Sequence, residues 1–123
     1  MAWQFEHDRP IYTQLLEQIR IHIISGTYPI GSKLPSVRDL AAEAAVNPNT
    51  MQKALSELER SGLIYSQRTS GRYVTEDSAM IQTLKKDIAK EKIKELLESM
   101  NQLGFEPAEA KLLLEETIKE MKS

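Results

Sequence analysis

Apolar residues recur at helical spacing in five stretches of the chain, and this pattern predicts five helices. The first helix is expected from Pro10 to about Ser25, and Gly26 ends it. Its apolar stripe consists of Tyr12, Leu15, Leu16, Ile19 and Ile23. The preceding segment, Met1 to Asp8, alternates apolar and polar residues. We expect it to form an extended arm in which Trp3 packs against the fold.

Two short helices are predicted next, and a tight turn separates them. Ser36 is a good N-cap for the first helix, and Asp39 completes a variant of the capping box. The narrow apolar stripe of this helix consists of Val37, Leu40, Ala41 and Ala44. Asn47 caps the second helix, with Pro48 at its first position. Because almost nothing separates Ala45 from Asn47, the chain must turn sharply between them.

The second of these helices has two different faces. Its core stripe consists of Met51, Ala54, Leu55 and Leu58. The opposite face carries Asn49, Gln52, Lys53, Ser56 and Arg60. Between Asn47 and Ser56 there is one cation and no acid. Amides can pair with adenine, and lysine can bind guanine or phosphate, so this face suits DNA. An ordinary polar surface helix is the alternative interpretation, although such a face usually mixes Glu with Lys.

A short basic hairpin follows these helices. Residues 63–65 begin one strand, residues 73–75 form its return, and Gly71 provides the turn. Arg68 and Arg72 stand at the base of this turn. Beside a helix-turn-helix, such a hairpin forms a wing, whose arginines can reach phosphates or a narrow minor groove. An ordinary exposed hairpin is the alternative. The fold expected from these elements is mainly α, a winged helix-turn-helix.

Two amphipathic helices are predicted after a short polar linker at residues 76–79. They run from about Met80 to Leu103 and onward from Pro107, and a connection of this length makes an αα-hairpin. Such a pair cannot bury both apolar stripes alone, so it either folds back on the first domain or pairs with a second copy. We favour pairing, because helix-turn-helix proteins usually bind two half-sites as symmetric dimers. The residues expected at the dimer interface are Leu84, Ile88, Ile93, Leu96, Leu97, Met100, Leu103, Leu113, Leu114 and Ile118.

Charge is distributed unevenly along the chain. The formal net charge is −2, but residues 1–75 carry +1 and residues 76–123 carry −3. All six arginines lie in the first part. Arginine binds phosphate and guanine through two hydrogen bonds, whereas lysine scattered among glutamates is typical of a solvated helix. A charge of +1 predicts only modest non-specific affinity for DNA.

Several other classes of protein find no support in the sequence. No apolar run approaches ~18 residues and no signal-peptide pattern is present, so nothing indicates a membrane or export. The absence of cysteine fits a cytoplasmic protein. His7 and His22 lie apart, and no HExxH, P-loop, GxGxxG or nucleophile-elbow motif occurs. We therefore expect neither an enzyme nor a metal site nor a cofactor.

Motifs at fixed spacing connect these features to a known family. They are LPSVRDLA at residues 34–41, VNPNT at 46–50, KALSELE at 53–59, GLI at 62–64 and GRYV at 71–74. Together they resemble the DNA-binding domain of the GntR family of bacterial transcriptional regulators, over roughly residues 8–75. VNPNT followed by Gln52, with a short C-terminal part, resembles the YtrA-like subfamily. Most of the family has Ser-Arg or Thr-Arg in place of Asn47-Pro48 and Arg in place of Gln52; these departures leave the expected fold unchanged.

The resemblance implies a homodimeric regulator, with repression favoured. Because helix-turn-helix dimers usually bind two half-sites, we expect a palindromic operator. We also expect any effector to be small or absent, because two helices per chain barely enclose a sizeable pocket. The expected domains are a winged helix-turn-helix at residues 1–75 and a two-helix dimerisation domain at residues 76–123. Arg38 occupies the position where the family's arginine meets the operator. The expected DNA-binding residues are Ser36, Arg38, Asn47, Asn49, Thr50, Gln52, Lys53, Arg68, Thr69, Ser70, Gly71 and Arg72. The alternative function is a winged helix that binds proteins without specific DNA binding.

Overall fold

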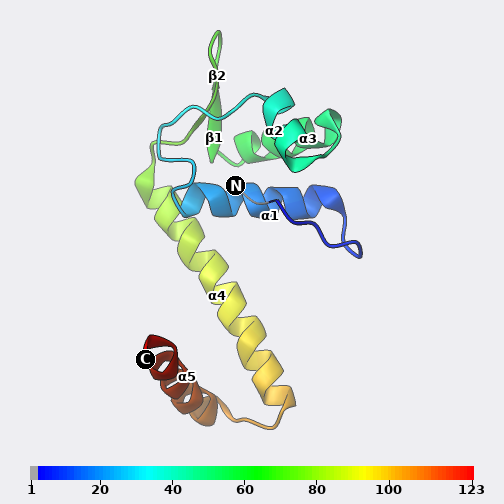
Figure 1. Ribbon diagram of the computed structural model, residues 1–123. Helices are drawn as coiled ribbons and strands as arrows, with labels where there is room; N and C mark the ends of the chain where they lie inside the picture. The colour runs from blue at the N-terminus through cyan, green and yellow to red at the C-terminus, as the bar shows by residue number, and fades with distance from the viewer. Residues whose placement is uncertain (1–2) are drawn as a thin grey trace. The chain divides into compact units, whose positions relative to one another are not determined.

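Five helices and one antiparallel hairpin make up the computed structural model, which describes residues 3–123 (Figure 1). The elements are α1 (Ile11–Ile24), α2 (Val37–Ala44), α3 (Pro48–Arg60), β1 (Ile64–Gln67), β2 (Gly71–Val74), α4 (Ser78–Gln102) and α5 (Pro107–Lys122). The predicted helices are all present, with ends shifted by one or two residues, which confirms the mainly α fold class. The chain forms two compact units, the first ending at Leu84 and the second running from Lys85 to Ser123. The boundary therefore lies inside α4, and the predicted division after residue 75 stays a prediction.

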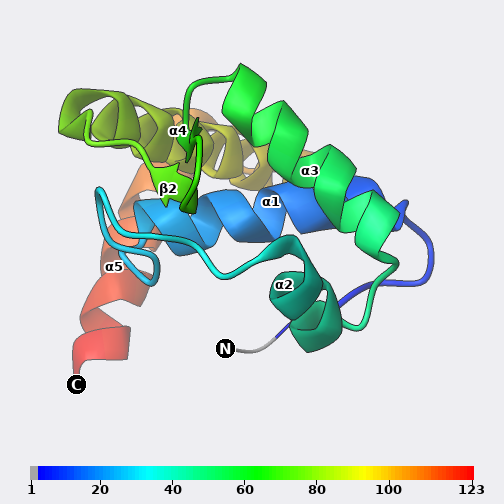
Figure 2. The ribbon, with the colours of Figure 1, turned by 90° about the horizontal axis from the view of Figure 1, so that it is seen from above.

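The core of the first unit lies where α3 packs against α1 and α2. Figure 2 shows α3 running obliquely over α1. The apolar stripes that the sequence predicts for α1 and α3 supply most of the fully buried side chains. They are Leu15, Ile19, Ile23, Met51, Leu55 and Leu58, each at most 2% exposed. Complete burial of one such side chain stabilises the fold by about 1.5–3 kcal/mol, so this contact determines how α3 is oriented.

The turn between α2 and α3 is as sharp as predicted, and it depends on one unusual backbone conformation. Ala45 adopts a left-handed conformation, with φ of 57°. The amide of Val46 then donates to the carbonyl of Ala41, which ends α2. This conformation costs an L-residue roughly 1–2 kcal/mol. The tight packing of α2 against α3 is what holds a non-glycine residue in it.

The wing is a four-residue ladder with a third segment along its edge. Ile64 pairs with Val74, and both side chains are buried in the core. The strands continue further than predicted, to Gln67 and from Gly71, so only residues 68–70 form the turn. Lys33 bridges Tyr73 across the outer edge of β2. In Figure 1 the wing projects beyond the helices of the first unit.

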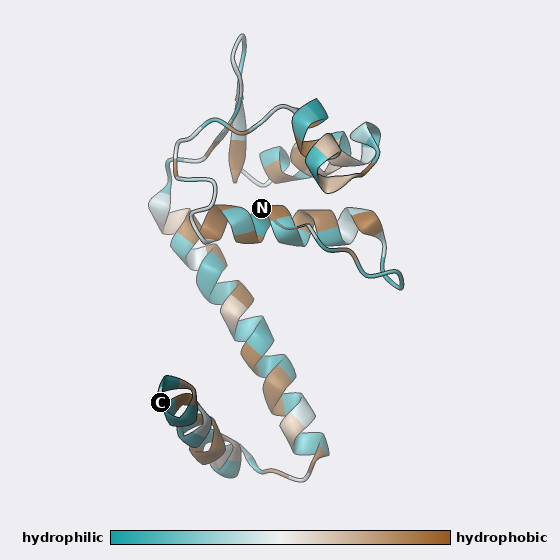
Figure 3. Ribbon diagram, viewed as in Figure 1, coloured by the Kyte–Doolittle hydropathy of each residue, from teal (hydrophilic) through white to brown (hydrophobic). Residues whose placement is uncertain are grey.

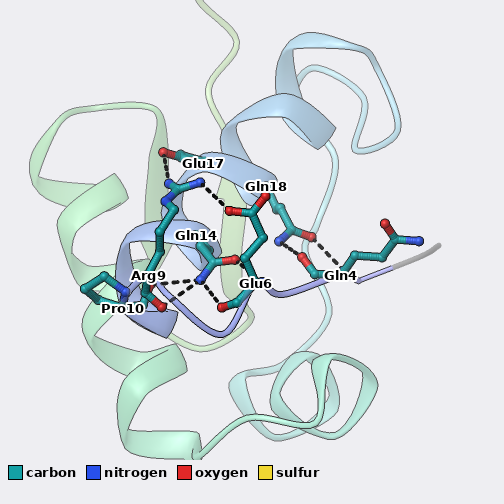
Figure 4. Close-up of polar contacts among 7 residues, drawn as sticks. All are labelled: Gln4, Glu6, Arg9, Pro10, Gln14, Glu17 and Gln18. Carbon is teal, nitrogen blue, oxygen red and sulfur yellow. Dashed lines mark hydrogen bonds and ion pairs between the residues drawn. The ribbon is translucent and has the colours of Figure 1, made fainter.

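The N-terminal arm is held against α1 by two glutamines (Figure 4). Nε2 of Gln14 donates to the carbonyl oxygens of Glu6 (3.0 Å) and Arg9 (2.9 Å), and its Oε1 accepts from the Glu6 amide (2.6 Å). Gln18 donates to the carbonyl of Gln4 (2.7 Å) at an exposed position. Gln14 is only 3% exposed, and its burial was not predicted from the sequence. Trp3 packs against the core, as predicted.

The second unit leaves much of its apolar surface uncovered. Gly104, with φ of 100°, follows the end of α4. A capping box between Glu106 and Glu109 starts α5, with Pro107 in the first turn. Among the described residues of this unit only Ala110 is a buried hydrophobic residue. Figure 3 shows apolar residues spread along both helices. As predicted, the hairpin does not bury its two stripes by itself.

The arm contacts yield a first prediction. Gln14→Ala should lower the free energy of unfolding of the first unit by about 1–3 kcal/mol, because it leaves backbone groups of Glu6 and Arg9 without partners in a part-buried site. Gln18→Ala is the matched control and should cost less than ~0.5 kcal/mol, as expected for an exposed contact. Urea titration followed by the fluorescence of Trp3, the only tryptophan, measures both variants. Equal losses would show that burial of Gln14 is unimportant.

Candidate nucleic-acid interface

The N-terminal half of α3 presents amide and amine side chains to solvent. Asn49, Gln52 and Lys53 are exposed, whereas Met51 between them is fully buried. Thr50 is half-buried. Helical geometry produces this division, because the apolar residues at i, i+3, i+4 and i+7 all turn toward the core. The polar face is therefore free to meet an external partner.

Two of the predicted DNA-binding side chains act as helix caps. Oγ of Ser36 accepts a hydrogen bond from the Asp39 amide (3.1 Å) and caps α2. Oδ1 of Asn47 accepts from the Asn49 amide (2.7 Å) and caps α3. Within residues 3–123 the Ser36 hydroxyl and the Asn47 side-chain amide donate no hydrogen bond, so both can donate to an external acceptor. Both helix N-termini also carry a partial positive charge, which favours phosphate.

Arginines divide into paired and unpaired ones. Arg38 and Arg68 are exposed and form no ion pair within residues 3–123. In contrast, Arg60 pairs with Glu57 on its own helix. Arg72 bonds to Glu59 through Nε (3.0 Å). Unpaired exposed cations can neutralise phosphates without first breaking an internal contact.

An open groove runs between the N-terminus of α2 and the wing. Its lining includes Ser36 from α2 and Arg68, Ser70, Gly71 and Arg72 from the wing. The structure thus brings together two segments that are about 30 residues apart in sequence. Thr69 is exposed in the same wing turn. A second open groove follows α3 and includes Thr50, Gln52 and Lys53.

Lys33 was not predicted as a site residue, but it lies in the first of these grooves. Its Cε lies 3.2 Å from the position that a Cβ on Gly71 would occupy. Gly71 has φ of 116°, so the turn needs glycine for its conformation as well as for this contact. The pairing of Lys33 with Tyr73 creates this neighbourhood. The family resemblance implies a short strand in this region that pairs with the wing, although the local sequence by itself does not indicate it.

In the first unit, hydrogen bonds or burial shift the pKa values of Glu59, His22 and Tyr28. Hydrogen bonds from Ser66 and Arg72 lower the pKa of Glu59. His22 lies edge-on to the rings of Trp3 (5.3 Å) and Tyr28 (5.8 Å), and burial lowers its pKa. Burial also raises the pKa of Tyr28 to about 12. The described part of the chain contains no group of three side chains that could hold a metal.

The family model for bacterial regulatory proteins of the gntR family matches residues 11–74. This segment spans α1 to the end of the wing, which is the unit that carries the exposed face of α3. The chain therefore belongs to the GntR family. It is a transcriptional regulator with a DNA-binding domain, and its relatives are regulators rather than enzymes.

Two curated relatives of Bacillus subtilis are similar over most of their length. The HTH-type transcriptional repressor YtrA is 39% identical over 98 residues, which cover 79% of this chain and 75% of YtrA. The uncharacterized HTH-type transcriptional regulator YhcF is 35% identical over 102 residues, which cover 83% of this chain and 84% of YhcF. These matches confirm the resemblance to YtrA-like members, including the part beyond the wing.

Solved structures support the same assignment. A GntR family transcriptional regulator from Listeria monocytogenes is 39% identical in sequence, with a TM-score of 0.84. The aligned region covers 91% of this chain and 98% of the other. AraR(DBD) in complex with operator ORX1 is 28% identical, with a TM-score of 0.52 over 61% of this chain and 92% of the other.

The helices within residues 3–123 include none with the length and apolar character that a membrane span requires.

Arg38 supplies the second prediction. Arg38→Ala should weaken binding to a specific DNA site by at least ~1 kcal/mol, the scale of one good side-chain contact to DNA. Lys111→Ala is the control, because it removes one positive charge from α5 in the second unit. Fluorescence anisotropy with a duplex selected by the wild-type protein measures both affinities at physiological salt. An unchanged affinity for Arg38→Ala would remove this residue from the interface.

Proposed function

We propose that the chain is a sequence-specific repressor that binds a palindromic operator as a homodimer in the bacterial cytoplasm. The observation that carries this proposal is the exposed, acid-free face at the N-terminal half of α3, flanked by a groove, by Arg38 of α2 and by Arg68 of the wing, which form no ion pair within residues 3–123. Asn49, Gln52 and Lys53 would contact base edges or nearby phosphates in the major groove. Arg38 and Arg68 would bind the backbone. The similarity to the repressor YtrA favours repression over activation.

Dimerisation rests on the apolar surface of the second unit. Leu103 is 76% exposed, and the exposed fraction of six further predicted interface residues exceeds one third: Ile93, Leu96, Leu97, Leu113, Leu114 and Ile118. Ile88 and Met100 are half-buried. Such a surface is large for a solvated hairpin, and a second copy would cover it symmetrically. Leu84 differs, because it packs against the core of the first unit.

The second unit also limits the size of any effector that the chain could bind. Within residues 85–123, all of which the structure describes, Ala110 is the only buried hydrophobic residue, so this unit offers little enclosed volume for a metabolite. We therefore propose that any effector is small or absent and that it would act by altering the spacing between the two DNA-binding units.

The third prediction tests specific DNA binding. Selection from random duplexes should yield a palindrome whose half-sites lie about one turn, ~34 Å, apart. Affinity for it should fall steeply as salt rises, because phosphate contacts release counterions. In vitro transcription from a promoter that overlaps the selected site should decrease when the protein is added. A chain that enriches no sequence and binds duplexes without salt dependence would instead be a protein-binding winged helix.

The fourth prediction concerns the dimer. Leu114→Asp should convert the dimer to a monomer, because it places a charge in the proposed apolar interface. Leu112→Asp is the matched control on the same helix. It is already 67% exposed and lies on a different face from the buried Ala110, so the dimer should persist. Sedimentation velocity gives the masses, and circular dichroism checks that both variants stay helical. Dissociation in both variants, or in neither, would contradict the assigned interface.

A further inference from the structure

One carboxylate joins the wing to the last turn of α3. Oε1 of Glu59 accepts a hydrogen bond from Oγ of Ser66 (2.8 Å) and another from Nε of Arg72 (3.0 Å). The two donors lie on different strands and face each other in the register of the hairpin. A single oxygen therefore ties both strands of the wing to the helix that carries the amide-rich face.

The pleat of the hairpin explains why these residues meet. Side chains alternate between the two faces of a strand, so Ser66 lies on the same face as Ile64, and Arg72 on the same face as Val74. Ile64 and Val74 are buried and fix the base of the wing in the core. The polar pair stands one step closer to the tip. The contact with Glu59 consequently controls the tilt of the wing above its apolar base.

The same contact restricts the guanidinium of Arg72. Its side chain is only 20% exposed, and it lines the groove between α2 and the wing. Nε donates to Glu59, whereas the two terminal nitrogens make no hydrogen bond to residues 3–123 and can donate to an external anion. A planar guanidinium held by one edge has a fixed orientation. Holding it in advance lowers the ordering cost when a phosphate binds.

A glutamate at position 59 is unexpected, because the same helix carries the face that would meet DNA. A carboxylate repels DNA phosphates, and the amide-rich half of α3 has no acid at all. Glu57, two residues earlier, pairs with Arg60 on its own helix. Within residues 3–123 it makes no hydrogen bond to the wing. Glu59 differs because all its side-chain hydrogen bonds are to wing residues. Its position is thus suited to organising the wing rather than to solvation.

We propose that Glu59 is a positioning residue for DNA recognition, which fixes the tilt of the wing and aims Arg72 at the phosphate backbone beside the operator half-site. This inference rests on the proposed function and deepens it. Glu59 does not touch DNA; it acts through Arg72.

Binding measurements on the full chain test this role. Glu59→Ala should lower affinity for the selected palindrome about tenfold, within the usual range of coupling between contacting residues. Affinity for a random-sequence duplex should fall as well, because a phosphate contact carries no sequence information. Hydroxyl-radical protection at the flanks of the site should weaken. Glu57→Ala is the matched control and should change affinity less than twofold.

A double-mutant cycle separates positioning from a general loss of structure. In an Arg72→Ala background, Glu59→Ala should have little further effect on specific affinity, because the residue it positions is absent. Glu59→Gln keeps an acceptor oxygen and should recover part of the affinity. Additive losses in the double variant would overturn the proposal.

A measurement without DNA keeps this inference distinct from the proposed function. Amide hydrogen exchange in β1 and β2 of the free protein should accelerate in Glu59→Ala and stay unchanged in Glu57→Ala. If the wild-type chain selects no DNA sequence, the proposed function fails, but this experiment still reports on the contact. Unchanged exchange of the wing amides in Glu59→Ala would overturn the positioning role whatever the DNA results are.

Discussion

Packing of the apolar side of α3 against α1 is the interaction on which the rest of the first unit depends. Met51 and Leu58 have no exposed surface at all. A helix buried on one side to this extent cannot rotate about its axis without exposing several large side chains, at a cost of about 1.5–3 kcal/mol for each. The outward direction of Asn49 and Gln52 follows from that burial. The polar side chains of α3 thus point outward because the opposite side of the same helix is packed in the core.

Three separate contacts hold the wing in place. Its base is buried through Ile64 and Val74, its outer edge pairs with Lys33, and its inner face bonds to Glu59. A two-stranded hairpin is only marginally stable in water by itself, so these attachments give it a defined place beside α3. They also place Lys33 and Arg72 along one groove with the N-terminus of α2. Stability of the wing and the arrangement of its cations therefore have the same origin.

The two units differ in how they satisfy their apolar surface. The first buries a continuous core, and its exposed face is polar where α3 begins. The second exposes large residues such as Leu103 and Met121. Charge follows the same division, because every arginine belongs to the first unit and the second is rich in lysine and glutamate. The first unit presents amides and unpaired arginines to an anionic partner, whereas the second exposes large apolar side chains.

Local sequence determined the helices, their caps and the two faces of α3. These features depend on residues within a few positions of each other, such as Ser36 with Asp39 or Asn47 with Asn49, so spacing and side-chain chemistry suffice to predict them. The family motifs extended that prediction to a DNA-binding regulator. Contacts between distant residues were decided only by the tertiary structure. Burial of Gln14 under the arm and the bond from Glu59 to Arg72 have no local signal, because each needs two segments that only the folded core brings together.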